Sequence, residues 1–333
     1  MSEITTMRTE AKTKIYIARR IPEEGLTWLR DFESKMWQGD GPVPREVLMR
    51  EAADCEGLLT MLTDRVDGAL LDACPRLRVV SNFAVGYDNI DVAAATERGV
   101  LVGNTPGVLT ETTADLAFAL LLATARRLVE GVEFIQQGQW RTWGPLDLLG
   151  GEVHHATLGI LGMGRIGREM AKRARGFDMQ ILYHNRRRDE AAEADLGVRY
   201  VEKAELLQQS DFVSVHVPLS AETRHYLKAE DFAHMKPTAI LINTSRGPVV
   251  DQAALYEAVR SGQIGGAGLD VTDPEPMLVN DPLLSLPQVI IVPHVGSATR
   301  TTRGKMAEIS ARNLAAALKG EPMLSCVNPQ AVK

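Results

Sequence analysis

Three ionisable residues follow three predicted strands in the second half of the chain, and their types suit proton and carboxylate chemistry. Arg246 lies in NTSRGPVVD, Glu275 in LDVTDPEP and His294 in VPHVGSAT. Ligands of doubly wound α/β sheets bind beyond the carboxyl ends of the strands, which meet at one edge of the sheet. We therefore expect the three side chains to lie at one edge and to act together.

This combination suits the reduction of a small 2-keto acid. The guanidinium of Arg246 can bind the carboxylate of the substrate and polarise its keto oxygen. His294 can protonate that oxygen, and it can remove the proton in the reverse direction. A neighbouring carboxylate of Glu275 would orient the imidazole and stabilise its protonated form. None of the six other histidines lies in an equivalent loop with Arg and Glu companions, so the combination carries the prediction.

A glycine-rich turn earlier in the chain predicts a dinucleotide cofactor. Gly162, Gly164 and Gly167 form G-x-G-x-x-G between strand candidates at residues 158–161 and 181–183, and a helical segment follows the turn. In this context the first glycine permits the tight turn, the second lets the backbone approach a pyrophosphate, and the third lets helix and strand pack closely. The start of the helix offers N–H groups and the positive end of its dipole to the phosphates.

The end of the next strand predicts which nicotinamide cofactor binds. Turns that bind NAD usually carry an acid about 20 residues after the glycines, which bonds the ribose 2′-OH. Here ILYHNRRRDE places Asn185 at that position, followed by Arg186, Arg187 and Arg188. Asn and Arg can accept a 2′-phosphate, and one or two charge-assisted bonds of roughly 1.5–3 kcal/mol would favour NADPH by about tenfold to several hundredfold. We predict NADPH, with NADH as a weaker alternative. A solvated arginine run, or Asp189 turned back toward the ribose of NAD, would remove this preference.

Alternating strand and helix candidates predict the elements that position these residues. Such alternation gives parallel sheets with helices on their faces, so the predicted fold class is α/β with doubly wound sheets. Residues 110–137 are predicted to form one long helix, capped by Thr110, before a Gly- and Trp-rich loop. The strand candidates are residues 14–18, 57–62, 77–83 and 100–103, then 158–161, 181–183, 199–201, 212–217, 239–243, 266–270 and 289–292; the other helix candidates include residues 23–31, 45–53, 68–74, 92–99 and 301–318.

Length and composition exclude several other classes of protein. A chain of 333 residues is more typical of two domains than of one. The net charge of −6 comes from interspersed acids and bases, which argues against a nucleic-acid-binding surface. The longest apolar stretch, residues 116–125, is too short to span a bilayer, and residues 1–13 indicate a loose tail without the apolar core of a secretory signal. Cys55, Cys74 and Cys326 form no metal or redox spacing, so we expect no metal site and a cytoplasmic protein with reduced thiols.

Motifs along nearly the whole chain resemble those of the D-2-hydroxyacid dehydrogenases. Within that family, the chain is most similar to the glyoxylate/hydroxypyruvate reductases. The matching motifs are AVGYDNID at residues 84–91, NTPGVLTETTADLAFALLLATARR at 104–127, LGMGRIG at 161–167, HVPLSAETRHYL at 216–227, LINTSRGPVVD at 241–251, GAGLDVTDPEP at 266–276 and VPHVGSAT at 292–299.

The resemblance implies roles for individual residues. Arg246, Glu275 and His294 would be the catalytic trio, and Asp270 would bond the nicotinamide carboxamide. The substrate carboxylate would be held by the backbone around Val85 and Gly86, with Ser297 nearby. The full set of predicted cofactor contacts is Thr113, Gly162, Met163, Gly164, Arg165, Ile166, Gly167, Asn185, Arg186, Arg187, Val217, Pro218, Thr223, Thr244, Ser245, Asp270 and Gly296.

The resemblance also implies the domain organisation. A Rossmann-type NAD(P)-binding domain, residues 111–296, would be inserted into a flavodoxin-like substrate domain made of residues 1–110 and 297–333. The family usually forms homodimers through the long helix and the loop after it. Trp140 and Trp143 lie in that loop, where they would either close over the neighbouring subunit's site or pack in the interface.

The leading hypothesis is NADPH-dependent reduction of small 2-keto acids, from glyoxylate to glycolate and from hydroxypyruvate to D-glycerate. One alternative is a related D-2-hydroxyacid or phosphite dehydrogenase. Val85 argues against phosphite, because an apolar side chain supplies no extra cation for a dianion. Another alternative is a catalytically inactive module that binds NADP(H) and regulates, since a fold alone does not establish turnover.

Overall fold

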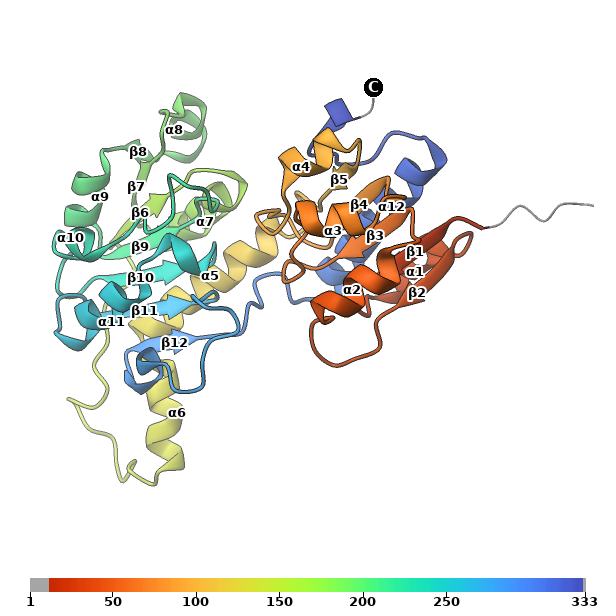
Figure 1. The fold of residues 1–333 in the computed structure, drawn as a ribbon. Coiled ribbons are helices and arrows are strands. Elements are labelled where there is room, and N and C mark those ends of the chain that lie inside the picture. The colour runs from red at the N-terminus through yellow and green to blue at the C-terminus, as the bar shows by residue number, and fades with distance from the viewer. Residues whose placement is uncertain (1–11, 332–333) are drawn as a thin grey trace, which may run out of the picture. The chain divides into compact units, whose positions relative to one another are not determined.

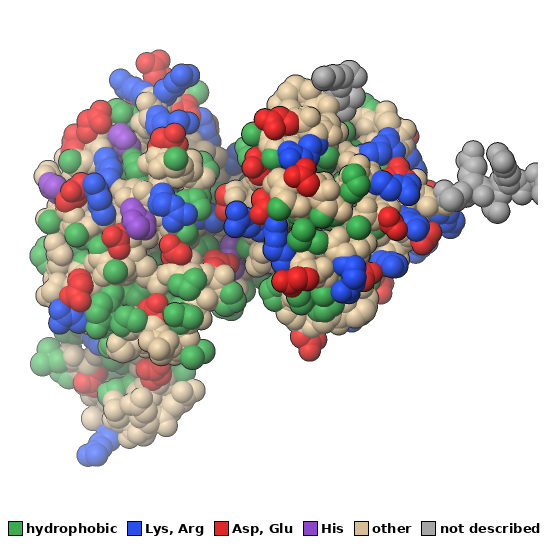
Figure 2. All heavy atoms as spheres, viewed as in Figure 1, with side chains coloured by type: hydrophobic (Ala, Val, Ile, Leu, Met, Phe, Trp, Pro, Cys, Tyr) green, Lys and Arg blue, Asp and Glu red, His purple; other side chains and the backbone are tan. Residues whose placement is uncertain are grey.

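The computed structural model describes residues 12–331 and shows two compact units (Figure 1). One unit combines the chain up to Val108 with the chain from Thr299 onward, and the other is Leu109–Ala298. The tail expected over residues 1–13 falls almost wholly outside the described residues. Figure 2 shows basic and acidic side chains interspersed over the visible face of each unit. No helix within residues 12–331 is both long enough and apolar enough to cross a bilayer.

The first unit is a five-stranded parallel sheet with helices on both faces. Its strand order, β2-β1-β3-β4-β5, is the flavodoxin-like order. One face packs against α2, α3 and α4, and α12 covers strands β3 and β4 on the other. The elements are β1 (Lys14–Ile17), α1 (Glu23–Leu26), β2 (Glu33–Met36), α2 (Arg45–Ala52), β3 (Gly57–Thr60), α3 (Gly68–Ala73), β4 (Val79–Asn82), α4 (Val92–Glu97), β5 (Leu101–Gly103) and α12 (Arg300–Lys319).

Strand β2 was not predicted, because its residues carry no strand pattern. Its sequence, ESKM, leaves three of four residues exposed. It lies at the edge of the sheet, where it pairs in parallel with β1. An edge strand is held by main-chain hydrogen bonds on one side only and needs no apolar face, so hydrophobic periodicity does not detect it.

The second unit is a seven-stranded parallel sheet in Rossmann order. The order β12-β11-β10-β9-β6-β7-β8 reverses direction between β6 and β9, the point at which doubly wound sheets bind ligands. All seven strands expected here are present. The elements are β6 (Thr157–Leu161), α7 (Arg165–Arg175), β7 (Gln180–His184), α8 (Glu190–Leu196), β8 (Arg199–Tyr200), α9 (Lys203–Gln209), β9 (Phe212–Val215), α10 (Ala229–Phe232), β10 (Ile240–Asn243), α11 (Gln252–Arg260), β11 (Gly266–Leu269) and β12 (Val289–Ile291).

Two apolar cores sandwich this sheet. Ile240 and Ile242 of β10 face the core that includes α5 and α7, whereas Leu241 between them faces the core of α9, α10 and α11. Successive side chains of a strand point to opposite faces, and both faces here are buried. Residues 240–242 of β10 therefore form a continuous apolar run in the sequence.

The long helix expected over residues 110–137 is two helices, so that prediction was wrong. Helix α5 (Thr110–Ala125) ends before Arg127, whose backbone is left-handed with φ of 51°, and α6 (Leu128–Gln136) begins after it. Apolar periodicity continues across this break and cannot reveal one residue of different backbone conformation. Thr110 is not the cap either. Leu109 precedes the first turn, and no side chain caps it.

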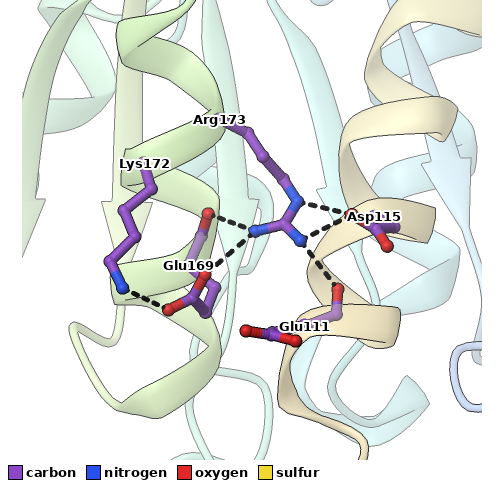
Figure 3. Close-up of polar contacts among 5 residues, drawn as sticks. All are labelled: Glu111, Asp115, Glu169, Lys172 and Arg173. Atoms are coloured by element: carbon purple, nitrogen blue, oxygen red, sulfur yellow. Dashed lines mark hydrogen bonds and ion pairs between the residues drawn. The ribbon is translucent and has the colours of Figure 1, made fainter. Parts of the chain in front are cut away.

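A cluster of charged residues fastens α7 to α5 (Figure 3). The guanidinium of Arg173 donates to Oδ1 of Asp115 at 2.7 and 2.5 Å and to the main-chain oxygen of Glu111 at 3.1 Å. On its own helix it donates to Glu169, which Lys172 also contacts. The helix that follows the glycine turn is thus held to the helix that covers β10 and β11.

We predict that Arg173→Ala lowers the free energy of unfolding by about 1–2 kcal/mol, since it removes charge-assisted bonds to two helices. Arg175→Ala is the matched control, because Arg175 is exposed on the same helix. Urea unfolding monitored by circular dichroism measures both variants. Equal losses in the two would show that the cluster does not hold the helices together.

Candidate active site

The ends of β11 and β12 are tied together by the buried carboxylate of Asp270. It accepts the N–H of Val295 at 2.6 Å and that of Gly296 at 2.8 Å, and its main-chain oxygen accepts the N–H of His294 at 3.0 Å. Asp270 is only 2% exposed, and its burial raises the pKa of the carboxyl group. The loop that carries His294 therefore has a fixed position relative to β11.

His294 and Glu275 form a direct pair. Nδ1 of His294 lies 2.5 Å from Oε1 of Glu275, and the backbone of His294 is left-handed with φ of 52°. Both side chains are partly exposed, at 24% and 30%. Because Glu275 occupies Nδ1, the second ring nitrogen, Nε2, is the one that can exchange a proton with a ligand.

Arg246 follows β10, where Asn243 shapes the loop. Oδ1 of Asn243 accepts from both the N–H and the hydroxyl of Ser245, at 3.0 and 2.8 Å, and its Nδ2 donates to the main-chain oxygen of Arg246 at 3.0 Å. Arg246 is half-buried, and its guanidinium donates to the main-chain oxygen of Ser245 at 2.8 Å. Asn243 was not among the residues predicted from the sequence. Its signal was an Asn two residues before a Ser, which is typical of an Asx turn.

The loops after β10 and β11 are in contact. A Cβ on Gly247 would lie 1.9 Å from the main-chain oxygen of Thr272, so only glycine fits beside Arg246. Strands β10, β11 and β12 are also neighbours in the sheet. The structure thus pairs Glu275 with His294 directly and places Arg246 on the adjoining loop.

Each glycine of the turn has a physical reason to be glycine. Gly162 has φ of +101°, and a Cβ there would meet the main chain of His216 and Val217 at 2.8–2.9 Å. A Cβ on Gly167 would lie 2.2 Å from the main-chain oxygen of Gly162, so α7 packs directly on the turn. A Cβ on Gly164 would meet nothing within 4 Å. The second glycine therefore faces open space, where a ligand can approach the backbone.

Further observations fit a dinucleotide at this edge. No side chain caps the start of α7, and Arg165 and Ile166 begin it beside the buried Met163. Thr244, at the end of β10, has a buried hydroxyl with no partner in the described part of the chain. The side chain of Thr113 lies against Gly296. These are the free donors and the orphaned polar atom that a phosphate-bearing ligand would satisfy.

The loop after β9 closes the other side of the turn. Thr223 donates to the main-chain oxygen of Pro218 at 2.6 Å and accepts from the N–H of Ser220 at 2.7 Å, which compacts the loop after Val217. Nε2 of His216 lies 2.8 Å from Oγ of Ser214. Burial lowers the pKa of His216 to about 4, so this ring is neutral at pH 7.

Asn185 and two arginines lie at the end of β7. Oδ1 of Asn185 accepts the N–H of Met163 at 2.8 Å, which joins the end of β7 to the glycine turn. Arg186 and Arg187 are exposed, and within residues 12–331 neither makes a hydrogen bond or an ion pair. Arg188 differs, because it pairs with Glu193 at 2.6 Å.

Asp189, the alternative partner for the ribose of NAD, is engaged within the protein. Its Oδ2 lies 2.5 Å from the guanidinium of Arg168, and its Oδ1 accepts the N–H of Ala192 at 3.0 Å as the cap of α8. Turning toward a ribose would break both interactions. Asp189 is thus held by Arg168 and by the start of α8, whereas Arg186 beside Asn185 is exposed.

Comparison with known proteins decides the family. The family model described as "D-isomer specific 2-hydroxyacid dehydrogenase, NAD binding domain" matches residues 118–296, all within the second unit. The chain belongs to this dehydrogenase family. The resemblance seen in the sequence motifs is thereby confirmed.

Relatives in the family match the chain over nearly its full length. A protein of Korarchaeum cryptofilum named glyoxylate reductase is 51% identical, with 97% of this chain and 98% of the relative covered. A crystal structure of a Thermus thermophilus protein matches with a TM-score of 0.89 at 44% identity, covering 95% of this chain and 100% of the other. The NADPH-dependent glyoxylate/hydroxypyruvate reductase of Sinorhizobium meliloti, solved with NADP and malonate, has a TM-score of 0.86 at 34% identity, covering 97% and 98%.

The residues predicted to bind the substrate carboxylate come from both units, and the two tryptophans predicted at the dimer interface lie in an exposed loop. Val85 and Gly86 are half-buried in the first unit, in the loop after β4, and Ser297 follows Gly296 in the second. Trp140 and Trp143 are 62% and 79% exposed in the loop after α6.

Among residues 12–331, no group of His, Cys, Asp and Glu side chains is arranged to hold a metal ion.

We predict that Gly164→Ala and Gly167→Ala have different consequences. Gly164→Ala should fold with nearly wild-type stability but weaken NADPH binding at least about tenfold, because the new methyl occupies the open space above the turn. Gly167→Ala should lower the free energy of unfolding by about 2–3 kcal/mol, because its Cβ meets the backbone of Gly162.

Fluorescence titration with NADPH and thermal unfolding measure the two effects. Wild-type NADPH affinity in Gly164→Ala would show that the turn does not hold the pyrophosphate.

Proposed function

We propose that this dehydrogenase reduces glyoxylate to glycolate and hydroxypyruvate to D-glycerate, with NADPH as the preferred reductant. The observation that carries the proposal is the pair of His294 and Glu275, joined at 2.5 Å on the loops beside Arg246. Two relatives support the substrate class, since one is named glyoxylate reductase and the other glyoxylate/hydroxypyruvate reductase. The second unit would be the cofactor domain and the first the substrate domain.

His294 would act as the general acid. Glu275 holds Nδ1, so the imidazolium donates its proton from Nε2 to the keto oxygen as that oxygen gains negative charge. The carboxylate of Glu275 holds the ring in the orientation from which this proton is transferred. A reduced nicotinamide, when bound, supplies the hydride that adds to the keto carbon. In the reverse direction, neutral His294 accepts the hydroxyl proton from the same position.

Arg246 would bind and polarise the substrate. Its planar guanidinium offers several N–H donors in a fork, which suits a carboxylate and an adjacent keto oxygen. Asn243 and Ser245 fix the backbone from which the guanidinium extends. The N–H groups around Val85 and Gly86, with Ser297, would complete the binding of the carboxylate. Asp270 would accept a hydrogen bond from the nicotinamide carboxamide while it holds the His294 loop.

We predict that His294→Ala lowers kcat/KM for glyoxylate by about 10²–10⁴-fold, the usual contribution of a general acid. Arg246→Lys should chiefly raise KM, because an ammonium keeps the charge but loses the fork geometry. The control is His234→Ala, since His234 is exposed and its Nδ1 contacts only the main chain of its own helix turn. Loss of absorbance by the reduced cofactor measures each rate. Rates near wild type in His294→Ala would remove His294 from the mechanism.

The preference for NADPH rests on the end of β7. Asn185 is held against the turn, and Arg186 and Arg187 are exposed beside it. A 2′-phosphate there would gain charge-assisted hydrogen bonds, whereas the ribose hydroxyl of NADH would gain none of comparable strength. The relative from Sinorhizobium meliloti, described as NADPH-dependent, supports the same choice.

Arg186→Ala should lower kcat/KM with NADPH by about tenfold and leave kcat/KM with NADH unchanged, because one bond to the 2′-phosphate is lost. Arg188→Ala is the matched control, since Arg188 is paired with Glu193. Steady-state kinetics with both cofactors and a fixed keto acid measure the change. A wild-type preference for NADH, or an equal loss with both cofactors in Arg186→Ala, would overturn this assignment.

The proposed enzyme is a cytoplasmic homodimer. Helix α6 and the loop after it expose large apolar side chains, with Leu128 56%, Val132 55% and Ile135 58% accessible. A hollow of about 870 Å³ lies where α5 meets α6, and it is lined by the end of α5, the start of α6 and residues near the beginnings of strands in the sheet. Exposed apolar surface of this kind marks an interaction site, and a second copy would cover it, with Trp140 and Trp143 near the neighbouring subunit. The cytoplasmic location is proposed because the three free cysteine thiols are typical of a reducing compartment.

A further inference from the structure

Three consecutive peptide groups in the loop after β4 are fastened to the sheet by their carbonyl oxygens. The main-chain oxygen of Ala84 accepts the N–H of Thr105 at 2.9 Å. The oxygen of Val85 accepts from Nδ2 of Asn104 at 2.8 Å, and that of Gly86 accepts from Nδ2 of Asn82 at 2.9 Å. Asn82 ends β4 and Asn104 follows β5, so two neighbouring strands hold one loop.

These bonds set the direction of the N–H groups. The carbonyl of one residue and the N–H of the next belong to one planar trans peptide and point in opposite directions. The bond from Thr105 to Ala84 therefore fixes the N–H of Val85, and the bond from Asn104 to Val85 fixes the N–H of Gly86. Within residues 12–331, no acceptor contacts either N–H. Successive N–H groups that face the same side form a cradle for an anion.

Asn104 is itself held in one orientation. Its Oδ1 accepts from the hydroxyl of Ser325 at 2.6 Å, which leaves Nδ2 as the donor to Val85. Its main-chain oxygen accepts from Nδ2 of Asn313 at 3.0 Å, and Oδ1 of Asn313 accepts the N–H of Ser325 at 3.0 Å. Asn104 is only 8% exposed. Hydrogen bonds from Asn313 and Ser325 thus fix the side chain and main chain of Asn104, which orients the loop.

Asn82 is held just as firmly. It is fully buried, and its Oδ1 accepts from the hydroxyl of Thr60 at 3.0 Å. Its Nδ2 donates to Oδ1 of Asn89 at 3.0 Å as well as to Gly86. Both peptide groups that flank Gly86 are therefore fixed by buried asparagine amides.

We propose that Asn104, supported by Asn82 and Ser325, is a positioning residue that aims the N–H of Gly86 at the carboxylate of the substrate. This inference rests on the proposed function, in which Val85 and Gly86 bind that carboxylate. Asn104 acts through the Val85–Gly86 peptide group and does not itself touch the substrate. It sets affinity for the keto acid, whereas proton transfer from His294 is unaffected.

The test compares Asn104→Asp with Asn328→Asp. An aspartate at 104 keeps the shape and the acceptor for Ser325 but turns an oxygen toward the carbonyl of Val85. Asn328 is the matched control, because it is fully buried in the same unit and its Nδ2 donates to the main-chain oxygen of Val100 beside β5. Asn104→Asp should raise KM for glyoxylate about tenfold or more, with little change in kcat or in NADPH affinity. Asn328→Asp should cost similar stability and leave KM unchanged.

If Asn104→Asp does not fold, Ser325→Ala provides a second test of the same prediction. It removes only the outer bond to Asn104, so KM should rise several-fold in the same direction. An unchanged KM in the folded Asn104 variant, or in Ser325→Ala where the former does not fold, would overturn the inference. A rise of equal size in Asn328→Asp would overturn it too.

A second measurement separates this inference from the proposed function. If the wild-type protein turns over no keto acid, the proposed function fails, and the inference is then judged by binding of the unreactive carboxylate oxamate. Nuclear magnetic resonance should show the amide signal of Gly86 shift with oxamate in the wild type but not in Asn104→Asp. The absence of that shift in the wild type would contradict the inference.

Discussion

The buried carboxylate of Asp270 is the constraint on which the candidate site depends. It accepts two main-chain N–H groups of the loop after β12, and its own main-chain oxygen accepts a third, from His294. Burial of a carboxylate is unfavourable unless its oxygens are satisfied, so the loop and the charge stabilise each other. The loop then presents His294 to Glu275, which follows Asp270 on the same strand end. The position of His294, the proposed proton donor, is thus set by Asp270, the residue that is proposed to meet the nicotinamide.

The first unit uses the same physical device on its own loop. Buried amides of Asn82 and Asn104 fix carbonyl oxygens, and the N–H groups on the other side of each peptide form the proposed binding surface. In both units, a polar side chain near a strand end orders a loop of the proposed site. Parallel sheets favour this arrangement, because all strand ends of one kind lie at one edge.

The sequence was sufficient to predict features that arise from local pattern. Apolar runs marked most of the seven strands of the second unit, and position after a strand end singled out Arg246, Glu275 and His294, of which the structure pairs the last two. It did not predict β2, whose exposed residues carry no pattern, or the left-handed Arg127 that divides α5 from α6. Nor did it reveal Asn104, because its partner Ser325 is distant in the chain and long-range hydrogen bonds leave no periodic signal.

The proposed reaction is reduction of a 2-keto acid by direct hydride transfer, with a proton from His294. The most direct measurement uses NADPH that carries deuterium at the transferable position of its nicotinamide, with glyoxylate as substrate. Mass spectrometry should find glycolate that carries one deuterium on its C2 carbon, in an amount equal to the cofactor oxidised. Glycolate without deuterium, or no glycolate from folded protein with either NADPH or NADH, would contradict the account.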